Sequence, residues 1–267
     1  MHNRIDNAFA RLRWEKCKGF IPYICAGDPN LKCTIDLALI LEKAGADLLE
    51  LGLPFSDPLA DGIVNQLAAQ RALVSGTTIH GLLDCVREIR SNSQIPIVLY
   101  SYLNPIFQFG ADKFHHEAEQ AGVDGLLILD LPPEEDGGEA AADSFESSKV
   151  LHIRLVAPTT PSDRIQKIAK SARGFLYYVS REGVTGAQDS IASSLPAKIA
   201  ELRKFSDLPI SVGFGISNPT QAREVAQYAD AVVVGSAIVD LIAKHGDKPE
   251  MVEKVSAFAK NLAEAVH

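Results

Sequence analysis

The sequence predicts an α/β fold, namely a single-domain (β/α)8 barrel of the TIM-barrel type over residues 1–267, with an additional N-terminal helix. Eight short apolar runs of strand length recur along the chain, and helical patterns separate most of them. The chain length of 267 residues suits one barrel, since such barrels commonly run about 250 residues. Strands that are apolar on both faces and alternate with helices favour a parallel sheet covered by helices.

The eight strands are expected where the apolar runs lie, at residues 21–25, 48–53, 97–102, 125–129, 151–156, 175–179, 210–213 and 231–234. A helix is expected where Ile79, Leu82, Leu83, Val86 and Ile89 form one apolar stripe. Another helix is expected to begin at Asn218–Pro219, because asparagine is a favoured N-cap and proline a favoured first residue.

A weak internal repeat supports this modular construction. The strings at residues 44–47, 121–124 and 228–231 each close a helix and lead into an apolar strand. The alternative is an open doubly wound sheet, which is disfavoured because Gly213 and Gly215 come late and lack the third glycine of a dinucleotide-binding fingerprint. Residues 133–149, which are rich in Glu, Gly and Ser, are expected to form a polar surface helix or loop.

Composition excludes several classes of protein. Hydrophobic residues make up 46% and charged residues 22%, as in globular proteins, and the net charge of -8 disfavours nucleic acid as a partner. The longest uncharged run, residues 91–111, contains two prolines, so no membrane span is expected. Four cysteines without metal-ligand spacing and an N-terminus unlike a signal peptide indicate a cytoplasmic protein. No metal site is expected, and His115 and His116 are expected to be solvated on a surface helix.

A carboxylate inside an apolar strand is the first candidate for chemistry. Glu50 lies near the C-terminal end of the strand at residues 48–53, where barrel active sites form. Burial of a carboxylate requires either a partner or a raised pKa, and a raised pKa makes a proton available near neutrality. Asp61 follows in a loop with two prolines, and it is expected either to take part in catalysis or to cap the next helix.

Glycine-rich loops follow three consecutive strands in the last third of the chain, at residues 183–187, 213–217 and 235–237. In barrels, the loops after the seventh and eighth strands bind phosphate through backbone N–H groups at the start of a short helix. Ser236 lies where such a helix is expected to begin.

These residues resemble the tryptophan synthase α-subunit family. LELGLPFSDPLADG at residues 49–62 is similar to that family's signature, and PYICAGDP, SREGVTGA, VGFGISNP and VVVGSAIV extend the similarity over nearly the whole chain in order. The resemblance implies a lyase that cleaves indole-3-glycerol phosphate to indole and glyceraldehyde 3-phosphate in tryptophan biosynthesis, by a retro-aldol step with no cofactor.

The resemblance also implies roles for individual residues. Glu50 and Asp61 match the catalytic carboxylates, with Glu50 moving protons and Asp61 accepting a hydrogen bond from the indole N–H. The remaining matches are Gly186, Gly215, Gly235 and Ser236 for phosphate, Tyr23, Leu127 and Tyr177 for the substrate pocket, and Asp57 and Thr185 for two mobile loops. Tyr100 stands at a pocket position where an aliphatic residue is expected, and Glu182 adds a negative charge beside the phosphate loop.

Partners are implied by the resemblance as well. Pro54, Asn104 and Asp130 match loop positions that face a pyridoxal-phosphate β subunit, in an allosteric assembly of two α and two β chains, and the pyridoxal phosphate would belong to that partner. Two other functions stay open at this point. One is another phosphate-binding barrel enzyme, such as a sugar-phosphate isomerase. The other is a non-enzymatic chain that activates a β subunit, which Tyr100 keeps possible.

Overall fold

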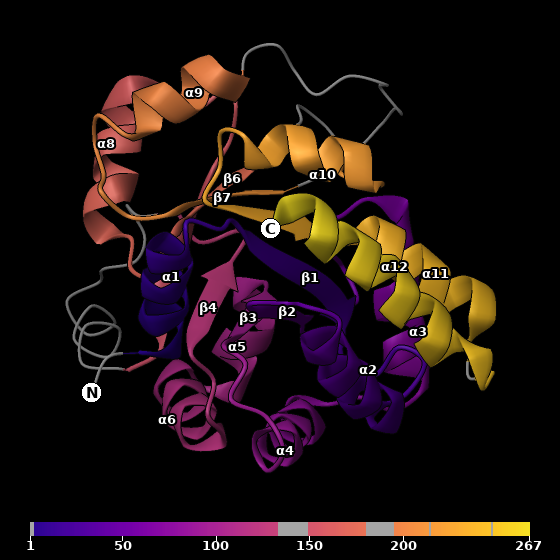
Figure 1. Cartoon of the computed structure of the whole chain (residues 1–267). Coiled ribbons are helices and arrows are strands. Elements are labelled where there is room, and N and C mark those ends of the chain that lie inside the picture. Colours follow the sequence, from indigo (N-terminus) through magenta and orange to yellow (C-terminus); the bar gives the residue numbers. More distant parts are fainter. Residues whose placement is uncertain (1–2, 133–148, 180–194, 214, 247) are drawn as a thin grey trace.

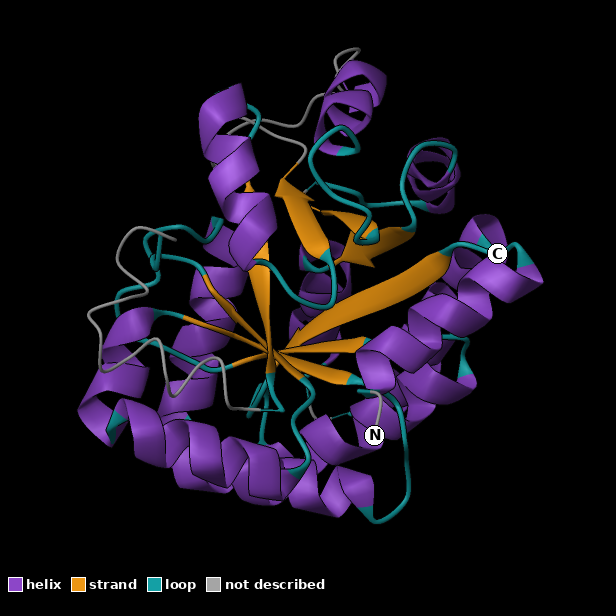
Figure 2. Ribbon diagram, turned by 90° about the vertical axis from the view of Figure 1, so that its left-hand side faces the viewer, coloured by secondary structure: helices purple, strands orange, loops and turns teal. Residues whose placement is uncertain are grey.

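The strands close into a parallel barrel in the computed structural model, which describes residues 3–132, 149–179, 195–213, 215–246 and 248–267 (Figures 1 and 2). Each strand pairs with the next along the chain, and the last returns to the first. The strands are β1 (Gly19–Cys25), β2 (Leu49–Gly52), β3 (Ile97–Ser101), β4 (Gly125–Ile128), β5 (Leu151–Val156), β6 (Leu176–Val179), β7 (Ile210–Gly213) and β8 (Ala231–Val234). All eight coincide with predicted runs to within two residues, and closure rules out the open sheet.

Helices surround the barrel (Figure 2). They are α1 (Arg4–Glu15), α2 (Leu31–Lys43), α3 (Ile63–Val74), α4 (Ile79–Arg90), α5 (Leu103–Phe109), α6 (Ala111–Ala121), α8 (Ser162–Ser171), α9 (Leu195–Leu202), α10 (Pro219–Ala226), α11 (Ser236–His245) and α12 (Glu250–Val266). The predicted stripe on α4 is buried. Asn218 caps α10 as predicted, because its side chain accepts a hydrogen bond from the backbone N–H of Gln221 at 3.0 Å.

The additional N-terminal helix, α1, closes the bottom of the barrel. Ile5, Phe9 and Leu12 are buried among inward-facing strand residues, and the ring centroids of Phe9 and Phe175 lie 5.6 Å apart. Among the described residues, α1 therefore covers the end of the barrel at which the strands begin.

The predicted repeat has a structural role that its sequence did not reveal. Asp47, Asp124 and Asp230 lie just before β2, β4 and β8. Each accepts a hydrogen bond from a backbone N–H at the start of the neighbouring strand, which is β1, β3 or β7 respectively. The donors are Phe20, Ile97 and Ile210, at 2.9, 2.9 and 2.8 Å. Each aspartate also pairs with at least one arginine. The repeat therefore joins neighbouring strands at the bottom of the barrel.

The expectation that His115 is solvated is wrong. His115 on α6 is 4% exposed, and its ring stacks on that of His152 at 5.2 Å, whereas His116 is exposed. The predicted polar segment at residues 133–149 lies almost wholly outside the described residues. None of the helices that the structure describes is long and apolar enough to cross a membrane.

Candidate active site

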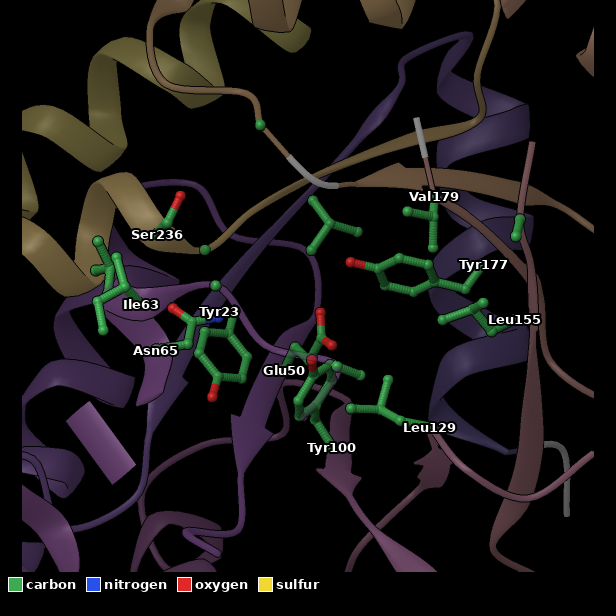
Figure 3. Close-up of a pocket in the computed structure, with 17 residues that line it drawn as sticks. Tyr23, Glu50, Ile63, Asn65, Tyr100, Leu129, Leu155, Tyr177, Val179 and Ser236 are labelled. Carbon is green, nitrogen blue, oxygen red and sulfur yellow. The ribbon is translucent and has the colours of Figure 1, made fainter. Parts of the chain in front are cut away.

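A cavity of about 500 Å³ opens where the strands end (Figure 3). Its volume falls in the range that small-molecule sites occupy, about 300–1,000 Å³. The described residues that line it are Tyr23, Glu50, Ala60, Gly62, Ile63, Val64, Asn65, Tyr100, Leu129, Leu155, Ala157, Tyr177, Val179, Gly215, Val233, Gly235 and Ser236. Most of these walls are apolar, and the polar groups lie on particular sides.

Glu50 points into the cavity from the middle of β2. It pairs in register with Tyr23 on β1 and Val98 on β3, both of which face the barrel interior, and its side chain is buried. Its Oε1 atom has no hydrogen-bond partner among the described residues. Burial, with the negative charge of Asp61 adding to it, raises the pKa of Glu50 to about 8. A carboxyl group with this pKa is mostly protonated at pH 7 and can donate its proton.

Asp61 lies at the end of the loop after β2, next to the cavity wall. Its carboxylate accepts hydrogen bonds from the Tyr100 hydroxyl to Oδ1 and from the Tyr102 hydroxyl to Oδ2, both at 2.8 Å. The Asn65 amide makes a longer contact with Oδ1 at 3.4 Å. Burial raises the pKa of Asp61, and these three donors lower it without cancelling the effect of burial.

The structure tests one of the two roles expected for Asp61, that of a helix cap. The N-cap of α3 is Gly62, and no side chain caps that helix. The Asp61 carboxylate accepts from two tyrosines instead of from the backbone of the helix. Asp61 is therefore not a helix cap, and its role in catalysis stays a prediction.

Aromatic rings form one wall of the cavity. Tyr23 and Tyr100 meet edge to face with centroids 5.1 Å apart, and Tyr177 lies on the other side of Glu50 in Figure 3. Gly52 makes room for this arrangement, because a Cβ there would come 2.4 Å from the Tyr23 hydroxyl oxygen. A flat apolar ring in the substrate could stack within these walls.

Ser236 and two glycines form another part of the cavity wall, next to Tyr23, since a Cβ at Gly235 would come 3.3 Å from the Tyr23 ring. Gly235 and Ser236 begin α11, and Gly215 follows β7 with φ of +83°. A helix N-terminus offers unpaired backbone N–H groups and a positive dipole end, which favour an anion. The cavity thus pairs an apolar, acid-bearing side with a side suited to phosphate.

Not every predicted site residue lies in this cavity. Leu127 is fully buried one level deeper in the barrel, and Leu129, two residues later on the same face, lines the cavity instead. Asp57 is exposed in the loop after β2. Thr185, Gly186 and Glu182 lie outside the described residues.

Several lining residues were missed by the sequence reasoning. Leu155 and Val179 lie near the ends of β5 and β6, and Leu129 directly follows β4. Because side chains of a strand alternate between its two faces, the sequence could have predicted that these residues point into the barrel. Tyr102 is not among the site residues that the sequence predicts. Its bond to Asp61 joins residues 41 positions apart, and no local pattern reveals such a contact.

The three residues predicted to face a partner lie in loops that contact one another. The backbone N–H of Ala60 donates to the Tyr102 hydroxyl at 3.0 Å, and the N–H of Leu103 donates to Asp130 at 2.7 Å. Asn104 and Asp130 are exposed. Pro54 is buried in the loop after β2, and its place in a partner-facing loop stays a prediction.

Within the ranges that the structure describes, no three His, Cys, Asp or Glu side chains are grouped closely enough to hold a metal ion. The ionisable groups that line the cavity or bond to a lining residue are carboxyls and phenols. Their arrangement suits proton transfer beside an aromatic ring and an anchored anion.

The chain is similar to known proteins over nearly its whole length. Residues 9–267 match the family model described as tryptophan synthase alpha chain. The tryptophan synthase alpha chain of Opitutus terrae is 50% identical over 261 residues, which cover 97% of both chains. The crystal structure of the Legionella pneumophila alpha subunit superposes with a TM-score of 0.89 at 38% identity, covering 100% of this chain and 99% of the other. A chain of the Pyrococcus furiosus tryptophan synthase complex superposes with a TM-score of 0.84 at 32% identity, covering 93% and 99%.

Proposed function

Because the chain belongs to the tryptophan synthase alpha chain family, we propose that Glu50 and Asp61 carry out the acid–base chemistry of that family's reaction in the cavity. The protein is a carbon–carbon lyase that cleaves indole-3-glycerol phosphate to indole and glyceraldehyde 3-phosphate in tryptophan biosynthesis. The observation that carries the proposed mechanism is a buried carboxyl group with a pKa of about 8 in the same cavity as the N-terminus of α11.

Glu50 moves the protons. Its protonated carboxyl group donates to C3 of the indole ring, and the resulting carboxylate accepts the proton of the C3′ hydroxyl as the C3–C3′ bond breaks. The electron pair of the broken bond restores the aromatic ring, and the hydroxyl carbon becomes the aldehyde. Glu50 ends the cycle protonated, so the reaction needs no external proton.

Asp61 stabilises the charge that develops. Protonation of C3 places positive charge on the indole nitrogen, and a carboxylate that accepts the N–H hydrogen bond lowers the energy of that state. Asp61 is buried next to the lining residues Ala60, Gly62 and Tyr100, where low polarity strengthens this interaction.

The phosphate is proposed to anchor the substrate at the start of α11. The proposed phosphate contacts are Gly186, Gly215, Gly235 and Ser236, and the cavity residues Tyr23, Tyr100, Tyr177 and Leu129 are proposed to surround the indole. Binding energy from the phosphate then orients the reacting carbon over Glu50. The loops that hold Asp57 and Thr185 are proposed to close over the substrate and exclude water.

An assay for released indole tests the proposal. The purified wild-type chain should form indole from indole-3-glycerol phosphate, and Glu50→Gln should lose at least about 1,000-fold in kcat while still binding inorganic phosphate. Asp61→Asn should keep its fold and lose about 100-fold or more. Turnover of Glu50→Gln near the wild-type level would refute the assignment.

The partner is proposed to be a tryptophan synthase β subunit, in an allosteric complex of two chains of each kind that receives the indole. Leu59, Ile63 and Phe107 are 87%, 65% and 70% exposed, and they lie on the loop after β2, α3 and α5, with Asn104 also on α5. Large exposed apolar side chains in one region mark contact surfaces. We propose that the lyase step itself uses no metal or organic cofactor, and that pyridoxal phosphate belongs to the β subunit.

Sedimentation of the chain mixed with a bacterial β subunit tests this assembly. Phe107→Ser should weaken the complex by at least about tenfold, since exposed aromatic anchors dominate interfaces. The matched control is Trp14→Ser. Trp14 lies on α1, at the other end of the barrel, and is 83% exposed in the wild type. If both substitutions weakened the complex equally, the proposed contact surface around Phe107 would be refuted. The proposal also includes a cytoplasmic location, which the four free cysteines support.

A further inference from the structure

Tyr100 bonds to Asp61 from a position where the resemblance leads one to expect an aliphatic side chain. Its hydroxyl donates to Asp61 Oδ1 at 2.8 Å, and both groups are at most 4% exposed. The Tyr102 hydroxyl donates to Oδ2 at the same distance. Each oxygen of the carboxylate thus has its own phenol, and the two bonds together fix its rotation.

Packing holds the Tyr100 ring independently of this bond. The ring lies edge to face against Tyr23 at 5.1 Å, and it stands opposite Gly52 in the β2–β3 register, a residue without a side chain. The Tyr100 ring lines the cavity, and its hydroxyl donates to Asp61. Tyr100 therefore contacts both the substrate cavity and the Asp61 carboxylate.

Without this hydroxyl, the one donor left to Oδ1 among the described residues would be the Asn65 amide at 3.4 Å, a length at which a hydrogen bond is weak. Burial already disfavours the charged form of Asp61 and raises its pKa, so each lost donor makes ionisation harder. Burial also raises the pKa of Tyr100 well above its ordinary value, so the phenol stays protonated and remains a donor.

We propose that Tyr100 is a positioning residue for the lyase reaction, which holds Asp61 ionised and correctly rotated to accept the indole N–H. This inference rests on the proposed role of Asp61. It makes Tyr100 an active contributor to catalysis in this chain, in addition to forming part of the pocket wall.

The pH dependence reports this role, because Asp61 must be ionised and Glu50 protonated. The titratable groups that face Asp61 from the packed elements are Tyr23 and Cys25 on β1, Glu50 on β2, Tyr100 and Tyr102 at the end of β3, and Tyr177 on β6. Loss of the Tyr100 hydroxyl should therefore move the acid limb of kcat/KM, which follows Asp61, and leave the alkaline limb, which follows Glu50, in place.

The experiment measures pH profiles of indole release by the full-length chain and its Tyr100→Phe variant. The acid limb should move up by about one pH unit, and kcat at the plateau should fall by about tenfold with KM changed less than twofold. Tyr178→Phe, at a buried tyrosine that faces the outer helices, should leave the profile unchanged. Tyr100→Leu, which also lacks the hydroxyl, should repeat the shift of the acid limb.

A double-mutant cycle separates this role from packing. In the Asp61→Asn background, Tyr100→Phe should change the residual rate less than twofold. An unchanged acid limb in both Tyr100 variants, an effect on KM alone, or a full tenfold loss in the Asp61→Asn background would each overturn the proposal. Failure of the wild-type chain to release indole would instead refute the proposed function.

Discussion

The ring of Tyr177 on β6 lies directly against Gly213 on β7. A Cβ at Gly213 would come 2.2 Å from the Tyr177 hydroxyl oxygen and 2.7 Å from the ring carbon that bears it. The missing side chain on one strand therefore decides where the aromatic ring on the next strand lies in the cavity. Substrate contacts on this side depend on a close approach between two strands.

Gly213→Ala should displace Tyr177 into the cavity and raise KM for indole-3-glycerol phosphate by about tenfold, since a methyl group in a tight site costs about 1–3 kcal/mol. Steady-state kinetics measures the effect. Tyr177→Phe in the same chain removes the atom that the new methyl group approaches most closely and should recover part of the lost affinity. Equal KM values for wild type and Gly213→Ala would show that the ring can move freely.

The wild-type pH profile should lose activity in alkali. Glu50 must be protonated to donate a proton to indole C3, and burial raises its pKa to about 8. The value of kcat/KM should therefore fall tenfold per pH unit above that pKa. Rates of indole release between pH 5 and 10 measure this limb. A rate that stays constant to pH 10 would exclude Glu50 as the proton donor.

Glu50→Gln should stabilise the fold while abolishing activity. The pKa of this acid rises from its ordinary value of about 4.5 to about 8 on folding, so the unfolded chain releases a proton that the folded chain retains, and wild-type stability falls as pH rises between those values. The gain in unfolding free energy should grow from about 1 kcal/mol at pH 5 to about 3 kcal/mol at pH 7.

Urea unfolding at several pH values measures this difference. Glu253→Gln, at an exposed position on α12, is the matched control and should show no such trend. A gain for Glu50→Gln that is the same at pH 5 and pH 8 would mean that Glu50 titrates normally.

Asp124→Ala should destabilise the barrel by about 3 kcal/mol or more, because removal of one partner leaves a buried charge without compensation. Arg90 pairs with Asp124 at 2.6 Å, and the arginine side chain is only 10% exposed. Asp84→Ala breaks an exposed pair with Arg87 and should cost less than about 0.5 kcal/mol. Urea unfolding of both variants tests the contrast, and similar losses would contradict it.

Local patterns were sufficient for the elements of the fold. The apolar runs gave β1 through β8 because a strand buried on both faces must be apolar throughout, whatever lies beside it. The Asn218–Pro219 signal gave the start of α10 because a cap acts within one turn. The same kind of reasoning gave a wrong prediction for His115, because the burial of this residue depends on stacking with His152 from another element.

The sequence by itself determined the barrel, the family resemblance and the position of Glu50, since each depends on residue type and spacing along one strand or loop. Only the tertiary structure decided that Asp61 does not cap α3, that Tyr100 and Tyr102 donate to its carboxylate, and that Leu129 and not Leu127 lines the pocket. Closure of the barrel brings strand ends from distant parts of the chain together. The hydrogen bonds from Tyr100 and Tyr102 to Asp61 form only because closure brings these distant residues together, and no local pattern in the sequence encodes that contact.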